Sequence, residues 1–381
     1  VFILKPKPKG APCAGSTDNR RYSLAFLPTV GYTPAYGLVG GLSVNIAGTI
    51  GNHPQDTRTS NVLINALGTT KRQLLFLMRS GLAFPHNRVL LETDFRLLIF
   101  NQDTYGLGIR RQPAVSNGLP FAQPMNFNYL RLYGTAYRRL QGPLYAGAGI
   151  AIDRHFAIDD KAMAAADTLP GVFTYQQQHN LPNGMPLKAY ANSGLTFSLR
   201  YDSRDNVANP YKGWFGAVQM RANMPWLGSQ RSNTAWSFEG RYYLNLQKSR
   251  PRHLLAFWAK ADFVNAAQVP YLALPAIGWD AYNRTGRGYV QGRIRGTAML
   301  YAEAEYRYPI SANGLLGGVL FTNITTAADG NNIGLAKSFA PAGGAGMRVK
   351  LDKKGRINIC ADYAFGIGGS RGLFFALQEA F

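Results

Sequence analysis

The sequence predicts an all-β fold, a transmembrane antiparallel β-barrel of about sixteen strands, and three observations favour it. Charged residues make up only 16% of the 381 residues, whereas Gly (42), Tyr (21) and Phe (21) are abundant. Strand-like segments alternate between an apolar, aromatic-rich face and a face too charged for a protein core. Finally, no apolar run approaches the roughly 18 residues that a membrane-spanning helix requires.

The clearest alternation runs from residue 299 to residue 309, directly after a Gly/Arg-rich stretch without hydrophobic period. Successive side chains of a strand point to opposite sides. One face of this segment carries three charged residues, and the other face carries none. We therefore interpret the charged face as the wall of a water-filled lumen. Its members are Met299, Tyr301, Glu303, Glu305 and Arg307.

Comparable segments follow one another along the chain, with no amphipathic helix of ten or more residues between them. We expect an N-terminal segment (1–21), periplasmic or in the lumen, and then one barrel (22–381) without a second domain. The expected strands cover residues 22–31, 37–48, 59–68, 71–81, 88–100, 127–139, 143–154, 189–202, 211–223, 231–247, 252–263, 296–308, 313–323, 339–351, 355–366 and 371–381.

The connections alternate in length, as in outer-membrane barrels with short periplasmic turns and long outer loops. Long loops are expected at residues 101–126, 155–188, 265–295 and 325–338. With an even number of strands, both termini then face the periplasm of a bacterial outer membrane.

The last strand should meet the first one to close the barrel. The first strand contains Pro28, which cannot donate a ladder hydrogen bond, and the last begins in a glycine-rich stretch ending at Gly372. We expect few backbone bonds at this seam, making it a lateral gate. On the last strand, Phe375, Leu377 and Phe381 are expected to share the lipid face and to form an assembly signal.

The N-terminal segment holds one of two cysteines, Cys13; the other, Cys360, is expected in the lumen near the periplasmic mouth. About eight residues separate Cys13 from the first strand, and they span up to about 28 Å. Residues 1–20 could thus cross the lumen and place the two thiols within bonding distance. Two unrelated thiols are the alternative.

The net charge of +21 raises nucleic acid as a partner, but the basic residues are spread along the chain without a binding module. Outer-membrane lipid and lipopolysaccharide fit this spread better. The G-x-S-x-G match at residues 368–372 falls in a strand-to-strand turn, whereas a nucleophile elbow joins a strand to a helix. The five histidines lack metal-binding spacing. We expect no enzyme, cofactor or metal.

Residues 200–216, RYDSRDNVANPYKGWFG, resemble the Asp-x-Arg-Asp-Asn…Pro-x-x-Gly motif of the BamA/TamA superfamily. The sequence GRGY at residues 286–289 resembles the Val/Ile-Arg-Gly-Phe/Tyr motif of its sixth outer loop, with Arg287, Gly288 and Tyr289 matching. EAEYRYP resembles the strand that follows, which includes Glu305 and Arg307. The first motif maps onto Asp202, Arg204, Asp205, Asn206, Pro210 and Gly213.

The resemblance implies insertion of outer-membrane proteins or translocation of secreted ones, with polypeptides as substrates. Two positions depart from it: Gly286 replaces Val or Ile, and Asn323 replaces an Asp. About 20 residues precede the first strand, too few for a POTRA domain, so periplasmic or lipoprotein partners are expected to capture substrates. A diffusion porin with a basic lumen, or a scaffold barrel of an envelope complex, are the alternatives.

The loop motif predicts a lock inside the barrel. Arg287 offers five donors in a rigid fork, and Glu303 and Glu305 line the lumen on the following strand. We expect Arg287 to pair with one of them, with Asn323 close by, because charge-assisted pairs are the strong ones. A mobile surface loop with a solvated arginine is the alternative.

Overall fold

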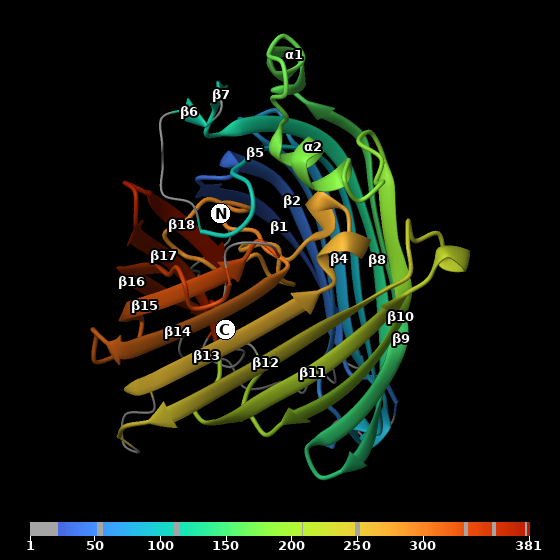
Figure 1. Ribbon diagram of the computed structural model, residues 1–381. Helices are drawn as coiled ribbons and strands as arrows, with labels where there is room; N and C mark the ends of the chain where they lie inside the picture. Colours follow the sequence, from blue (N-terminus) through green and yellow to red (C-terminus); the bar gives the residue numbers. More distant parts are fainter. Residues whose placement is uncertain are drawn as a thin grey trace, which may run out of the picture.

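The computed structural model describes residues 22–51, 56–109, 115–116, 118–207, 209–247, 252–330, 334–352, 356–377 and 379–381. Sixteen strands form one antiparallel sheet, curled into a nearly closed barrel (Figure 1). Each barrel strand pairs with the strands before and after it in the chain, except across the seam. The fold class and strand number are those that the sequence predicts.

Every expected strand is present. The barrel strands are β1 (Tyr22–Thr33), β2 (Gly37–Gly48), β3 (Ser60–Thr69), β4 (Leu74–Ala83), β5 (Val89–Thr104), β8 (Gln123–Gln141), β9 (Leu144–Asp160), β10 (Tyr190–Asp202), β11 (Gly213–Asn223), β12 (Asn233–Asn245), β13 (Leu254–Val264), β14 (Ala298–Pro309), β15 (Leu316–Ala328), β16 (Ala340–Asp352), β17 (Ile357–Gly366) and β18 (Arg371–Leu377).

Short elements lie in the connections. They are the hairpin β6 (Val115–Ser116) and β7 (Leu119–Pro120), helices α1 (Met163–Ala166) and α2 (Tyr175–Asn180), and the 3-10 turns η1 (Pro85–Asn87), η2 (Pro225–Leu227), η3 (Ala266–Gln268) and η4 (Tyr271–Ala273). Strands β5, β8 and β9 run further than the sequence predicts. Their added residues are mostly polar and lie beyond the apolar belt, so no alternation marks them.

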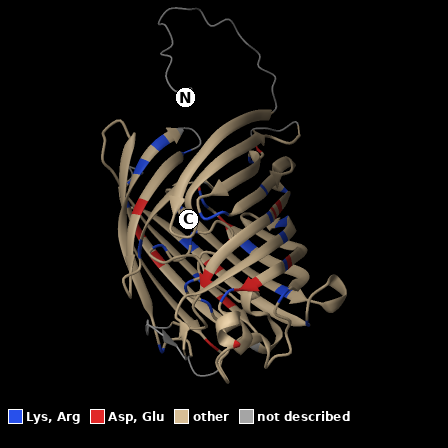
Figure 2. Ribbon diagram, turned by 90° about the horizontal axis from the view of Figure 1, so that it is seen from above, with Lys and Arg blue, Asp and Glu red and all other residues tan. Residues whose placement is uncertain are grey.

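The two faces of the sheet follow the alternation of the sequence. Outward side chains are large, apolar and accessible; Phe197, Leu199 and Trp214 are 50%, 55% and 55% exposed. Charged residues lie along strands that ring the lumen (Figure 2). Arg96, Asp153 and Glu303, for example, are buried inside the barrel. Among the described residues, no helix is long and apolar enough to cross a membrane.

The two ends of the barrel differ. The long-loop end carries residues 105–122, 161–189, 265–297 and 329–339, and α1 and α2 stand there at the top of Figure 1. The short-turn end carries tighter connections such as 84–88 and 142–143, as well as the start of β1 and the end of β18. This alternation is the one expected from the sequence.

Among the described residues, no ladder joins β1 to β18. The two strands are neighbours in space, yet they occupy the two ends of the strand order. Pro28 lies within the unbroken β1–β2 ladder opposite Leu42. A Cβ placed on Gly372 would lie 2.4 Å from Cγ of Pro34, in the β1–β2 turn. The two edges therefore approach each other closely at Gly372, where there is no room for a side chain.

One expectation about the last strand is wrong. Phe375 is 42% exposed on the outer face, but β18 ends at Leu377 and the chain then turns inward. Phe381 is 4% exposed and packs inside the barrel, with ring centroids 6.2 Å from Tyr243 and 5.2 Å from Trp258. Polar partners in the lumen hold this turn, described below. Phe381 therefore belongs to the lumen, not to a lipid-facing row.

The predicted cysteine pairing joins Cys360, which the structure describes, to Cys13, which it does not. Cys360 faces the lumen from β17 and is 1% exposed. Cys13 and the whole segment 1–21 lie outside the described residues, so the disulfide stays a prediction.

Candidate functional site

Residues 265–297 connect β13 to β14 and are here called the inner loop. They fold back from the long-loop end into the lumen. Tyr271 and Trp279 belong to an apolar cluster with Phe100, Phe127 and Tyr129 of β5 and β8. Further along, Ile277, Tyr289 and Ile294 pack against small and apolar side chains of β14, β15 and β16. The loop therefore crosses the lumen from one wall to the other.

At the tip of the inner loop, Arg287 is 5% exposed and meets three carboxylates, which we call the Arg287 cluster. Its Nη2 hydrogen-bonds to both Glu303 and Glu305 of β14. Its Nη1 donates to Oδ2 of Asp362 on β17 at 2.7 Å. The guanidinium carbon also lies 3.7 Å from the ring centroid of Phe321. A buried arginine so partnered holds the loop tip in one place.

The backbone around Arg287 is built for close approach. Gly286 and Gly288 have φ of +80° and +105°, which side chains rarely adopt. A Cβ on Gly288 would lie 2.8 Å from Cβ of Ala342. Asn323 of β15 donates from Nδ2 to the carbonyl of Arg287 at 2.9 Å. Hydrogen bonds to both backbone and side chain thus fix the tip.

The inner loop contacts both sides of the seam. Asn283 Nδ2 donates to the hydroxyl of Tyr36, in the β1–β2 turn, at 2.9 Å. Ser370, between β17 and β18, donates its hydroxyl to the carbonyl of Gly288 at 2.7 Å. The hydroxyl of Tyr289 accepts a hydrogen bond from the N–H of Ile367 at 3.1 Å. One loop therefore bridges, from inside, the two edges that no ladder joins.

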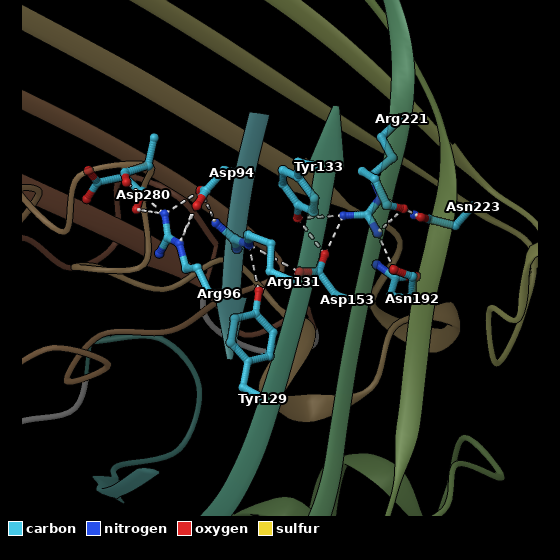
Figure 3. Close-up of polar contacts among 12 residues, drawn as sticks. Asp94, Arg96, Tyr129, Arg131, Tyr133, Asp153, Asn192, Arg221, Asn223 and Asp280 are labelled. Carbon is cyan, nitrogen blue, oxygen red and sulfur yellow. Dashed lines mark hydrogen bonds and ion pairs between the residues drawn. The ribbon is translucent and has the colours of Figure 1, made fainter. Parts of the chain in front are cut away.

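A second anchor comes from the opposite wall, where alternating acids and arginines on β5, β8, β9 and β11 form what we call the wall network (Figure 3). Arg96, 1% exposed, pairs with Asp94 and donates to the carbonyl of Ala281 at 2.7 Å and to Oδ1 of Asn283 at 3.1 Å. The network continues through Arg131, Tyr129, Tyr133, Asp153 and Arg221.

Residues 379–381, the C-terminal tail, join the Arg287 cluster. Arg348 of β16 pairs with Asp362 and, through Nε, with Oε2 of Glu379 at 2.7 Å. Asn358 donates to the other oxygen of Glu379 at 2.6 Å. Arg307 pairs with Glu305 and donates to the carbonyl of Phe381 at 3.0 Å. Arg348 and Arg307 therefore link the tail to Asp362 and Glu305, two carboxylates that also bind Arg287.

The first family motif builds a turn across the short-turn end. Asp202, at the end of β10, accepts from Nε of Arg204 at 2.9 Å and from Arg58, beyond β2, at 3.2 Å. Asn206 accepts the N–H of Asn209 at 2.8 Å. Gly213 has a φ of +112°, which a side chain rarely adopts. Pro210 is buried in the same turn.

Asp205 ties this turn to the far side of the mouth. It accepts the N–H of Tyr211 at 2.9 Å and pairs with Arg356, between β16 and β17, at 2.7 Å. Partial burial raises the pKa of the Asp205 carboxyl, but the hydrogen bonds from Arg356, Tyr211 and Lys212 outweigh it and hold the pKa below its ordinary value. With the Arg58 contact, the turn reaches both the β2–β3 connection and the β16–β17 connection.

The structure thus brings Arg287, Glu303, Glu305 and Asn323 together, while the strand motif forms a separate turn at the short-turn end. Sequence reasoning missed the roles of Asp362, Arg96 and Asn283. Alternation places the first two in the lumen, but their partners are distant in sequence. Among the described residues, no group of three or more His, Cys, Asp and Glu side chains could hold a metal ion.

The sequence profile of the Omp85 superfamily domain matches residues 173–368. This range includes the inner loop, the three carboxylates around Arg287 and the turn at residues 203–212. No curated protein sequence matches the chain significantly.

Solved structures give the same fold. BamA from Haemophilus ducreyi lacking POTRA domains 1–3 superposes with a TM-score of 0.60 and 15% identity, over 94% of this chain and 70% of that chain. CdiB from Escherichia coli superposes with a TM-score of 0.57 and 10% identity. CdiB from Acinetobacter baumannii superposes with a TM-score of 0.54 and 12% identity, and each match covers 94% of this chain. The chain covers 62% and 59% of those two proteins, less than two thirds of their length. At these identities the likeness concerns the fold alone.

Proposed function

Because this chain belongs to the Omp85 superfamily, we propose that it inserts outer-membrane proteins into the membrane, or translocates secreted ones, through the seam between β1 and β18. One observation carries the proposal most directly: the inner loop hydrogen-bonds to both edges of a sheet that no ladder closes. Moving the loop would release both edges together. The Arg287 cluster would then be the lock that holds the gate shut.

The edge of β1 supports strand exchange with a substrate polypeptide. Residues Tyr22–Pro28 are exposed without a break, so this part of the strand is accessible on both faces. An unpaired strand edge is a template for adding another extended chain. A client strand could therefore pair with β1 while its apolar side chains enter the lipid.

A plain diffusion pore fits less well. The inner loop crosses the lumen, the C-terminal tail packs inside it, and the turn at residues 203–212 reaches Arg58 and Arg356 at the short-turn end. No observation favours a scaffold role specifically. Members of this superfamily are non-enzymatic assembly or transport barrels, and the proposal needs no catalysis.

We also propose the setting in which the barrel acts. It would lie in the bacterial outer membrane with both termini in the periplasm, in contact with lipid and lipopolysaccharide. Periplasmic or lipoprotein partners would deliver substrate polypeptides to its short-turn end. Pull-down from native membranes would identify them.

A reversible cross-link of the seam tests the gate. Pro34→Cys with Gly372→Cys places two thiols where the edges approach, in a Cys13→Ser, Cys360→Ala background. Oxidation should abolish outer-membrane protein assembly or secretion in cells that depend on this chain, and reductant should restore it. The control pair, Met347→Cys with Ala361→Cys, joins strands already laddered and should change nothing. Full cross-linking at the seam with normal activity would refute the gate.

A further inference from the structure

We propose that Arg88 and Arg138 form a binding site for the phosphate of an anionic glycerophospholipid, in the leaflet at the short-turn end. The site rests on the membrane location proposed above, but not on gating. Arg138 lies on β8, three residues before the strand ends at Gln141, and is exposed. It shares a face with Ala136, which is also exposed, whereas Tyr137 between them is buried, so Arg138 belongs to the outward row that faces lipid.

The sheet holds the backbones of Arg88 and Arg138 close together. Arg138 is the register partner of Val89, the residue directly after Arg88. The N–H of Arg139 donates to the carbonyl of Arg88 at 2.8 Å, which joins the β4–β5 turn to the end of β8. Two exposed arginines therefore lie at one corner of the barrel.

The surroundings of this corner are apolar and accessible. Leu140 is 56% exposed, Val89 is 38% exposed, and Phe84 and Leu144 are each 36% exposed. A charged side chain on a lipid face is tolerated near the membrane interface, where its long stem lies along apolar surface and its head reaches the headgroups. The corner thus offers an apolar surface for lipid acyl chains next to the positive charges of two arginines.

Neither arginine has a carboxylate partner: among the described residues, no ion pair involves Arg88 or Arg138. Their neighbour Arg139 differs, because it donates to the carbonyls of Gly142 and His86. A guanidinium fork matches the geometry of a phosphate. Since Arg138 points into the lipid-facing row, a lipid phosphate reaches it more directly than an acidic protein at the rim.

Native mass spectrometry of the purified chain tests the site, with dioleoylphosphatidylglycerol and dioleoylphosphatidylcholine as probes. We expect several-fold more phosphatidylglycerol adducts on the wild-type chain. Arg88→Gln with Arg138→Gln should reduce them to the phosphatidylcholine level. Arg154→Gln is the matched control, because Arg154 is exposed on the same outer face at the long-loop end. Heat-modified migration on gels checks that each variant is folded.

Equal phosphatidylglycerol binding by the double variant and the wild type would overturn the assignment. An acidic protein would then be the better candidate ligand for the two arginines. No preference between the two lipids would overturn the assignment as well. The measurement needs no client polypeptide, so failure of the seam experiment leaves its outcome unaffected.

Discussion

Asn283 and Tyr36, 247 residues apart in the chain, are joined by a hydrogen bond of 2.9 Å from the side-chain amide to the phenolic hydroxyl. Asn283 belongs to the inner loop and Tyr36 to the turn that follows β1. On the other side of the seam, Ser370 binds the same loop through Gly288. The position of the loop and the closure of the seam are therefore coupled by direct contacts.

Removing these two contacts should loosen the seam. Tyr36→Phe with Ser370→Ala deletes one hydroxyl on each side, and a hydrogen bond contributes about 0.5–1.5 kcal/mol net. We expect backbone hydrogen exchange in β1 and β18 to rise by about tenfold, since about 1.4 kcal/mol is a factor of ten. The control is Tyr243→Phe with Ser311→Ala. The Tyr243 hydroxyl has no hydrogen-bond partner among the described residues, and the Ser311 hydroxyl lies in the β14–β15 turn, away from the seam. Equal exchange in both doubles would contradict the coupling.

Arg287→Ala should unlock the inner loop while the barrel stays inserted. The substitution leaves Glu303, Glu305 and Asp362 buried without their shared cation, and removing one partner of a buried ion pair costs about 3–5 kcal/mol. Single-channel conductance in planar bilayers should increase, and the temperature of heat-modified migration should fall.

The matched control for this change is Arg293→Ala in the same loop. Arg293 stacks on Tyr105 and Phe121, contacts worth about 0.5–2 kcal/mol. Conductance close to wild type is expected for it. If both variants conduct alike, the lock is not specific to Arg287.

The sequence could predict the sheet because each strand carries its own alternation, which burial in lipid on one side and water on the other enforces locally. The same logic placed Arg287 beside Glu303 and Glu305, because the loop and the strand after it are adjacent in the chain. Asp362 pairs with Arg287 only because β17 curves round to face the loop. That relationship belongs to barrel closure and leaves no local signal.

Phe381 shows where alternation misleads. Continued past residue 377, the pattern assigns Phe381 to the lipid face, yet Glu379 and Phe381 find Arg348 and Arg307 inside the barrel. A carboxylate and a carbonyl are more stable when they bind two buried arginines than when they lie in lipid without hydrogen-bond partners. The alternation of side chains identifies a strand, but it does not show at which residue the strand ends.

Phe381→Ala should release the tail from the lumen. Its ring packs between Tyr243 and Trp258, and truncating a buried Phe costs about 3–5 kcal/mol. Hydrogen exchange in a peptide covering residues 371–381 should increase, with a smaller rise around Arg287 through the shared Asp362 and Glu305. Phe375→Ala, on the lipid face, should alter neither. Unchanged exchange in Phe381→Ala would place the tail's anchor elsewhere.

Acidification should weaken the cap at the long-loop end. His179 of α2 is 8% exposed, and its Nε2 lies 2.9 Å from the carbonyl of Val269 in the inner loop. Burial, with the charge of Arg295, lowers the pKa of His179 below its ordinary value, although the hydrogen bond to Val269 opposes this. A lowered folded pKa means that the stabilisation is present above about pH 6.5 and is lost as pH falls.

Exchange in residues 161–189, corrected for intrinsic rates, should therefore be faster at pH 5 than at pH 7.5. His179→Gln keeps a donor for Val269 and removes the titration, so its exchange should not depend on pH. A pH response of equal size in this variant would rule out His179 as the cause.

Asn323→Asp restores the residue expected from the family resemblance and should nevertheless destabilise this chain. The side-chain amide of Asn323 donates to the carbonyl of Arg287, and a carboxylate cannot donate. In register, Asn323 also stands opposite Glu303 on β14, so a second negative charge would face the first in a buried site. The loss should be about 1–3 kcal/mol or more, because a buried carbonyl is left unpaired, and heat-modified migration should show it. Asn323→Ala removes the donor without adding charge and should cost less. Greater stability in Asn323→Asp would mean that Arg287 turns to the new carboxylate, and that the amide is dispensable.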